Sequence, residues 1–169
     1  ASAIHYLRKR RCRANSAILS VKTLVLEYWT PLLVWLIAIF FFSTDTFSTG
    51  ETSRFIVPIL TLLFPGLLPA EIDFWHAVIR KLSHIAEYFV LATFVYRSLK
   101  YNQQDLMAPK LGAAAFVLLT ALADEFHQSF TASRSASIVD VGYDCLGGIW
   151  ALWLITTYEG WRLRSHSVL

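Results

Sequence analysis

The chain has 169 residues, with 15 Lys and Arg against 12 Asp and Glu; hydrophobic residues make up 56% of it and charged residues 16%. This balance and the mean hydropathy of +0.49 lie outside the range of soluble globular domains, which argues against a soluble protein. Two cysteines, Cys12 and Cys145, are too few for a disulfide framework, and we expect both to be free thiols.

Residues 1–22 form a basic arm that we expect to be cytoplasmic, and an apolar run at 24–42 follows it. The run lacks a small-residue cleavage site, so we interpret it as a retained membrane span and not as a signal peptide. Pro31 lies near its start, where the first-turn amides need no intrahelical partner.

The next apolar stretch, 54–69, follows a polar loop and is interrupted by Pro58, Pro65, Gly66 and Pro69. A straight span needs about 20 uninterrupted apolar residues. We therefore predict an external helix that lies on the membrane surface or re-enters it, with a broken spanning helix as the alternative.

Three more spans are predicted at 78–99, 111–127 and 138–158, before a short tail at 162–169. With the first span they form one transmembrane domain at 23–161. The expected fold is an all-α membrane protein, a four-helix transmembrane bundle with an additional interfacial or re-entrant helix.

The distribution of charge predicts the orientation of this bundle. The arm, the 97–110 connection and the tail hold 11 of the 15 Lys and Arg. Because Lys and Arg favour the cytoplasmic side, both termini should be cytoplasmic and the 43–78 and 128–137 segments external. Nine of the twelve acidic residues then lie toward the outside.

This orientation places three polar sets in one outer layer of the bundle: "KLSHIAEY" (81–88), "DEFHQ" (124–128), and Asp140 with Asp144. Their i, i+3 and i, i+4 spacings give each helix a polar stripe. An ionised group at this depth costs roughly 2.5–3.5 kcal/mol unless it is paired or hydrated. An externally open polar pocket is therefore predicted, and its candidate ligand-binding residues are Lys81, His84, Tyr88, Asp124, Gln128, Arg134, Asp140 and Asp144.

Structural roles remain open for several of these residues. Arg80 and Lys81 are also suited to anchor the helix at the interface. Asp140 is close enough to a helix start to cap it. Glu125 points away from Asp124 on the helix, and we expect it to face solvent.

The segments "KLSHIAEY", "ALADEFHQSF", a following Arg and "DVGYDCLGG" together resemble the VanZ-like family of small bacterial membrane proteins. The resemblance covers roughly residues 78–150. It implies a multi-pass protein of the bacterial cytoplasmic membrane and cell envelope, in a family named after a teicoplanin-resistance accessory protein. This chain has Asp144 where the family usually has Asn, and Ala132–Ser133 where it usually has Pro-Gly before Arg134. The matching positions are Lys81, His84, Tyr88, Asp124, Glu125, Gln128, Arg134, Asp140 and Gly147.

The preferred functional hypothesis is binding of a polar or anionic headgroup, a lipid-linked cell-wall intermediate or a glycopeptide. Lys81 and Arg134 would hold the anionic group. An accessory subunit of a larger membrane complex is one alternative, since the many aromatic side chains suit contacts with membrane lipids or with other membrane subunits. We expect no nucleic-acid partner.

The other alternative is a hydrolase or transferase that acts on a lipid-linked substrate. His84 or Glu87 would be the general base, and Asp124 or Asp140 would orient it. The same four residues could bind a metal ion through hard ligands, although no zinc-type Cys/His spacing exists and we expect no cofactor.

Overall fold

The computed structural model describes residues 21–44, 49–101, 103–130 and 137–166, and every regular element in these ranges is a helix. A π-helical segment, η1, precedes Pro31, which has no backbone N–H to donate. The elements are η1 (Leu24–Trp29), α2 (Thr30–Phe42), α3 (Thr49–Leu63), α4 (Pro69–Lys100), α5 (Met107–Gln128) and α6 (Ile138–His166).

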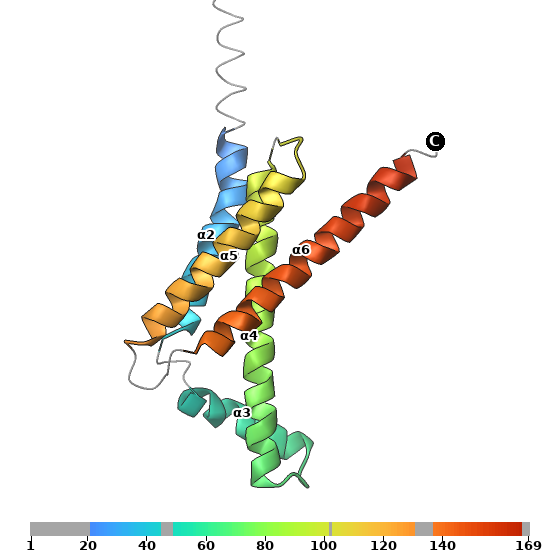
Figure 1. The fold of residues 1–169 in the computed structure, drawn as a ribbon. Coiled ribbons are helices and arrows are strands. Elements are labelled where there is room, and N and C mark those ends of the chain that lie inside the picture. Colours follow the sequence, from blue (N-terminus) through green and yellow to red (C-terminus); the bar gives the residue numbers. More distant parts are fainter. Residues whose placement is uncertain (1–20, 45–48, 102, 131–136, 167–169) are drawn as a thin grey trace, which may run out of the picture.

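The long helix α4 is the centre of the fold, with α2, α5 and α6 packed against it (Figure 1). Helix α3 lies across the N-terminal end of α4, and the end of α6 extends away from the other helices (Figure 1). Both ends of the described chain and the α4–α5 connection lie at the opposite end of the bundle from α3 (Figure 1). We call these the arm end and the α3 end.

A stripe of buried side chains on α4 forms the core. Tyr88, Leu91, Ala92 and Val95 follow each other at helical spacing and are almost fully buried. Alanines and valines of α5 and α6 pack against this stripe, among them Ala113, Val117, Ala121, Val141 and Ala151. These small side chains allow the three helices to approach closely.

Helices α4 and α6 approach each other closely at Gly147. A Cβ atom on Gly147 would lie 2.2 Å from the backbone oxygen of Ile85, a distance that no real Cβ contact reaches. A Cβ on Gly148 would lie 2.8 Å from the Val117 side chain of α5. These two glycines therefore set how near α6 comes to its neighbours.

Three helical segments are long and apolar enough to cross a membrane: Val21–Phe42, Met107–Gln128 and Ile138–Ser165. They correspond to three of the four predicted spans. Helix α4 contains the predicted span 78–99 but is not among the three, since charged and polar residues occupy much of its N-terminal half. The all-helical fold is confirmed, and the fourth span stays a prediction.

Several predicted boundaries differ from the structure. Helix α3 begins at Thr49 and ends at Leu63, so the predicted helix at 54–69 is displaced toward the N-terminus. Pro69, interpreted from the sequence as a break, is instead the first residue of α4, where a missing N–H costs nothing. The Glu71 carboxylate accepts a hydrogen bond of 2.8 Å from the Leu68 N–H and so closes this helix start.

A polar contact joins α3 to a buried histidine of α4. His76 Nε2 lies 3.3 Å from Thr52 Oγ1, and His76 is almost fully buried, just before the predicted second span. Burial lowers the pKa of His76, the charge of Arg80 lowers it further, and Asp73 opposes these effects. The neutral imidazole is therefore the form that fits the docked α3.

Acidification should loosen α3. Because the folded pKa of His76 lies below the ordinary value of about 6.5, the folded state binds fewer protons, and the stabilisation is lost as pH falls below that value. Hydrogen exchange of residues 49–63, corrected for its intrinsic pH dependence, should rise between pH 7 and pH 5. The variant His76→Gln keeps a polar side chain without the titration, and an equal rise in this variant would contradict the assignment.

Candidate functional site

Five polar residues of α4, α5 and α6 are buried where these helices meet, and we call them the buried polar layer: Tyr88, Asp124, Glu125, Gln128 and Asp144. The Gln128 amide donates a hydrogen bond of 2.9 Å to one oxygen of Asp124, and Asp124 is 2% exposed. The Tyr88 hydroxyl and one oxygen each of the three acids have no hydrogen-bond partner in the described part of the protein. Such a layer inside an apolar bundle is a recognised sign of a functional site.

Glu125 belongs to this layer, so its predicted exposure to solvent is wrong. It is 6% exposed, and one of its oxygens accepts a hydrogen bond of 2.6 Å from the Ser137 N–H just before α6. The first amides of a helix have no intrahelical acceptor, and here a residue from another helix supplies one. The spacing of residues within α5 cannot predict this contact, because the donor, the Ser137 N–H, lies outside α5 and twelve residues further along the chain.

His84 and Asp144 form the principal polar contact between α4 and α6. His84 Nδ1 lies 3.0 Å from Asp144 Oδ1, with the His84 side chain 16% exposed and the Asp144 side chain 0% exposed. A carboxylate can only accept, so Nδ1 carries the hydrogen and Nε2 remains for a ligand. The predicted orienting groups, Asp124 and Asp140, are therefore wrong for His84, whose partner is Asp144.

The pairing follows from the helix crossing. Ile85 of α4 and Gly147 of α6 lie together where the two helices approach closely. Ile85 is one residue after His84, and Gly147 is three residues after Asp144. The crossing thus brings the imidazole and the carboxylate to the same level. Carboxyl groups of Asp124 and Glu125 also lie within electrostatic range of Asp144.

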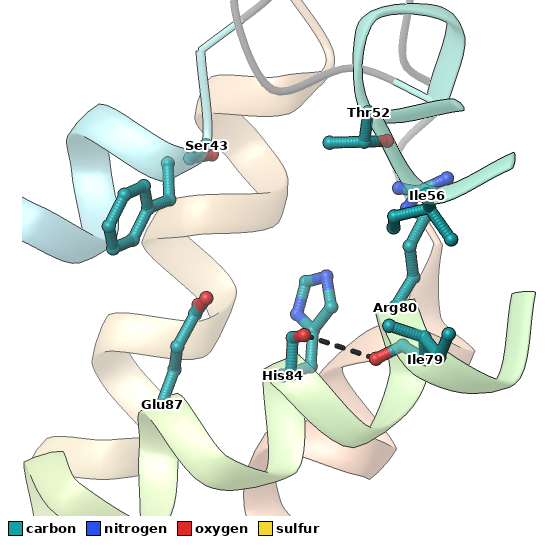
Figure 2. A pocket seen from close by; sticks show the side chains of 9 residues that line it. Ser43, Thr52, Ile56, Ile79, Arg80, His84 and Glu87 are labelled. Carbon is teal, nitrogen blue, oxygen red and sulfur yellow. Dashed lines mark hydrogen bonds between the residues drawn. The ribbon is translucent and has the colours of Figure 1, made fainter. Parts of the chain in front are cut away.

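A pocket of about 190 Å³ opens on the side of His84 that faces α2 and α3, and we call it the outer pocket. Figure 2 shows His84 between Glu87 and Arg80, with Ser43 and Thr52 across the space. The Ser83 hydroxyl donates a hydrogen bond of 3.1 Å to the Ile79 carbonyl. The lining residues are Phe42, Ser43, Thr52, Ile56, Ile79, Arg80, Ser83, His84 and Glu87.

A second pocket of about 170 Å³ lies between α4 and α6, and we call it the side pocket. It is lined by Ala77, Arg80, Lys81, His84 and Asp140. The Lys81 ammonium lies 4.1 Å from the ring centroid of Tyr143 on α6, a cation–π contact that holds it against the neighbouring helix. Arg80 and His84 line both pockets.

The predicted site residues thus divide into two groups. Lys81, His84 and Asp140 meet at the side pocket, and Glu87 joins His84 at the outer pocket. Tyr88, Asp124, Gln128 and Asp144 are buried behind them, and Arg134 lies outside the described residues.

Arg80 lines both pockets, although its place near the helix start also suits an interface anchor. A signal for this placement exists, because residues 80, 84 and 87 follow an i, i+4, i+7 stripe on one face of α4. Ser43 and Thr52 have no comparable signal, since their approach depends on where the end of α2 and the start of α3 lie.

The structure gives no support to the metal alternative. In the ranges it describes, no group of three or more His, Cys, Asp or Glu side chains is placed to hold a metal ion. Asp124 lines neither pocket: it lies in the buried polar layer and accepts a hydrogen bond from Gln128.

Comparisons with known proteins agree with the residue pattern. A search of curated proteins and a search of solved structures each found no match to the chain. The model of the VanZ/LLP1 family matches residues 28–159, which include every residue of both pockets and of the buried polar layer. With a match over most of its length, the chain belongs to the VanZ/LLP1 family.

Proposed function

We propose that this protein is an integral membrane protein of the bacterial envelope whose outer and side pockets bind a polar headgroup that carries an anionic group. The observation that carries the proposal is the position of His84. Asp144 fixes its ring from behind, and Arg80 lines the two pockets on either side of it. Arg80, His84 and Lys81 together give the pockets an anion-binding face.

The distribution of polarity supports a membrane location. Large apolar side chains such as Ile37, Leu119 and Trp153 are exposed, at 70%, 65% and 60%, while carboxyl groups are buried inside the bundle. This arrangement is costly in water and favourable in lipid. We propose α4 as the fourth span, because its polar residues point into pockets and the bundle interior.

The bias of Lys and Arg toward the arm end favours cytoplasmic termini, so the α3 end and both pockets would face outward. Helix α3 would then lie on the external surface of the membrane. We propose the bacterial cytoplasmic membrane as the location, in line with the family.

The lining of the pockets favours a phosphate-bearing headgroup. The Arg80 guanidinium suits a bidentate contact with a phosphate and the Lys81 ammonium acts as a point charge. Glu87 and Asp140 can accept hydrogen bonds from hydroxyl or amino groups of the same ligand. Both pockets are smaller than the roughly 300–1,000 Å³ of sites for drug-sized ligands, which favours a headgroup over a whole glycopeptide.

Binding of undecaprenyl phosphate to the full chain in nanodiscs tests this proposal. The variants Arg80→Gln and Lys81→Gln should each raise the Kd about 10-fold or more, because each removes a charge-assisted contact of roughly 1.5–3 kcal/mol. The control is Arg54→Gln, since Arg54 is exposed and pairs with Glu51 on α3. A Kd that neither variant changes, or that the control raises equally, would reject the proposal.

The pair of His84 and Asp144 also favours a second candidate, hydrolysis of the bound phosphate ester. An imidazole oriented by a buried carboxylate can act as a general base toward water. Ser83 is not aligned with His84 as a nucleophile, since its hydroxyl bonds to the Ile79 carbonyl. Release of inorganic phosphate in the same experiment, lost in His84→Asn and kept in Arg54→Gln, would identify an enzyme; binding without release would identify a receptor.

A further inference from the structure

A separate pocket lies at the arm end of the bundle, and we call it the basic pocket. It has a volume of about 450 Å³ and is lined by η1, by the C-terminal part of α4 with Tyr101 after it, and by one residue of α6. Its lining residues are Tyr28, Thr93, Tyr96, Arg97, Lys100, Tyr101 and Ile155. No residue of this pocket belongs to the outer pocket, the side pocket or the family pattern described above.

The aromatic rings of the basic pocket hold its arginine in place. The Arg97 guanidinium carbon lies 4.9 Å from the ring centroid of Tyr28, and the rings of Tyr28 and Tyr101 are 4.7 Å apart. A guanidinium stacked on a ring keeps its N–H groups at the edge, where they can reach a ligand. The tyrosines therefore orient the positive charge without neutralising it.

Two of the acidic side chains near the basic pocket, Glu159 and Asp105, already have partners. Glu159 accepts a hydrogen bond from the Tyr96 hydroxyl and pairs with Lys110 at 2.8 Å. The Asp105 carboxylate accepts hydrogen bonds of 2.8 and 3.4 Å from the N–H groups of Met107 and Ala108 at the start of α5. These acids therefore have partners other than Arg97.

Asp105 remains a helix cap and not a counterion for the pocket. The hydrogen bond from the Met107 N–H is the main cause that keeps the pKa of Asp105 below its ordinary value. Lys100 donates to the backbone carbonyl of Asp105 at 2.8 Å, which fixes the ammonium beside the pocket. Within the described ranges Arg97 forms no ion pair, and neither does Glu27, next to Tyr28.

We propose that the basic pocket is a second ligand site, which binds a phosphate group through Arg97 and Lys100. Two cations on one turn of a helix match the oxygens of a phosphate mono- or diester. Anionic lipids of the cytoplasmic leaflet supply such a group at this end of the bundle, and soluble phosphate compounds supply it from the cytoplasm. This site is independent of the proposed function of the pockets at the α3 end.

Native mass spectrometry of the detergent-solubilised full chain with phosphatidylglycerol or phosphatidylcholine tests the proposal. The protein should retain phosphatidylglycerol in preference to phosphatidylcholine. The double variant Arg97→Gln/Lys100→Gln should weaken phosphatidylglycerol binding about 10-fold or more, whereas Arg162→Gln, an exposed arginine at the same end of α6, should leave it unchanged. Arg80→Gln should also have no effect, which separates this site from the outer and side pockets.

Competition identifies the source of the phosphate. Displacement of the lipid by millimolar inorganic phosphate or glycerol 3-phosphate would assign the site to soluble phosphates, and no displacement would assign it to lipid. Arg97→Lys, which keeps the charge but loses the planar fork, should weaken binding several-fold while the protein still shows the wild-type melting temperature. Equal binding of phosphatidylglycerol by wild type and the double variant, with no binding of soluble phosphate, would overturn the proposal.

Discussion

Replacing Gly147 with alanine should separate α4 from α6 and destabilise the protein by roughly 3 kcal/mol or more, because the new methyl group would lie 2.2 Å from the Ile85 carbonyl oxygen. That oxygen belongs to helical backbone and cannot move as a flexible side chain can. The separation should also lengthen the contact between His84 and Asp144 beside it, so ligand binding should be lost together with stability. Thermal unfolding in nanodiscs and the undecaprenyl phosphate Kd would measure both effects.

Gly142 provides the matched control for Gly147. It lies on the same helix, two residues before Asp144, and a Cβ atom there would meet no other atom within 4 Å. Alanine at this position should be neutral or stabilise the helix by up to about 1 kcal/mol, since alanine is the better helix former. If Gly147→Ala were as stable as Gly142→Ala, the close approach of α4 and α6 would be wrong.

The largest polar effect should come from removing His84 while Asp144 remains. His84→Leu would leave the Asp144 carboxylate, 0% exposed, without its hydrogen-bond partner, at a cost of about 3–5 kcal/mol. Asp144→Ala should cost less, roughly 1–3 kcal/mol, because the imidazole at 16% exposure can reach water through the pockets. Unfolding by SDS titration in mixed micelles would measure these free energies.

The double variant His84→Leu/Asp144→Ala should recover a large part of the loss in His84→Leu, since no unpaired buried charge remains. Asp144→Asn keeps an acceptor for His84 Nδ1 and should be more stable than Asp144→Ala. Ser83→Ala, on the same turn of α4, should change stability by no more than about 0.5 kcal/mol. Strictly additive losses in the double variant would show that the two side chains are not coupled.

The predicted helices depended on features that are local in the sequence. Apolar runs interrupted by polar connections predicted the helices at 24–42, 111–127 and 138–158, and all three are present. Helix ends were less predictable, because caps depend on single contacts such as the one between Leu68 and Glu71. Pro69 was also hard to place from sequence, because a proline breaks a helix in its interior but is accepted in its first turn, where it lies in α4.

The candidate site was predictable as a layer but not as a set of contacts. Helical spacing puts His84 and Glu87 on one face of α4 and Asp140 and Asp144 on one face of α6, and this pattern predicts a polar region. Spacing within a helix does not say what lies across from that face. It therefore could not choose between Asp124, Asp140 and Asp144 as the partner of His84.

The sequence by itself determined which segments are helical, which of their faces are polar and toward which end of the bundle the charges collect, because these properties depend on residues a few positions apart. The tertiary structure decided that Asp144 and not Asp140 holds His84, that Glu125 is buried, and that Arg80 lines two pockets. These outcomes depend on how closely two helices can approach and at what level they cross. Because Gly147 has no side chain, α6 can approach the backbone of α4 at Ile85, and this contact fixes the level at which the two helices cross.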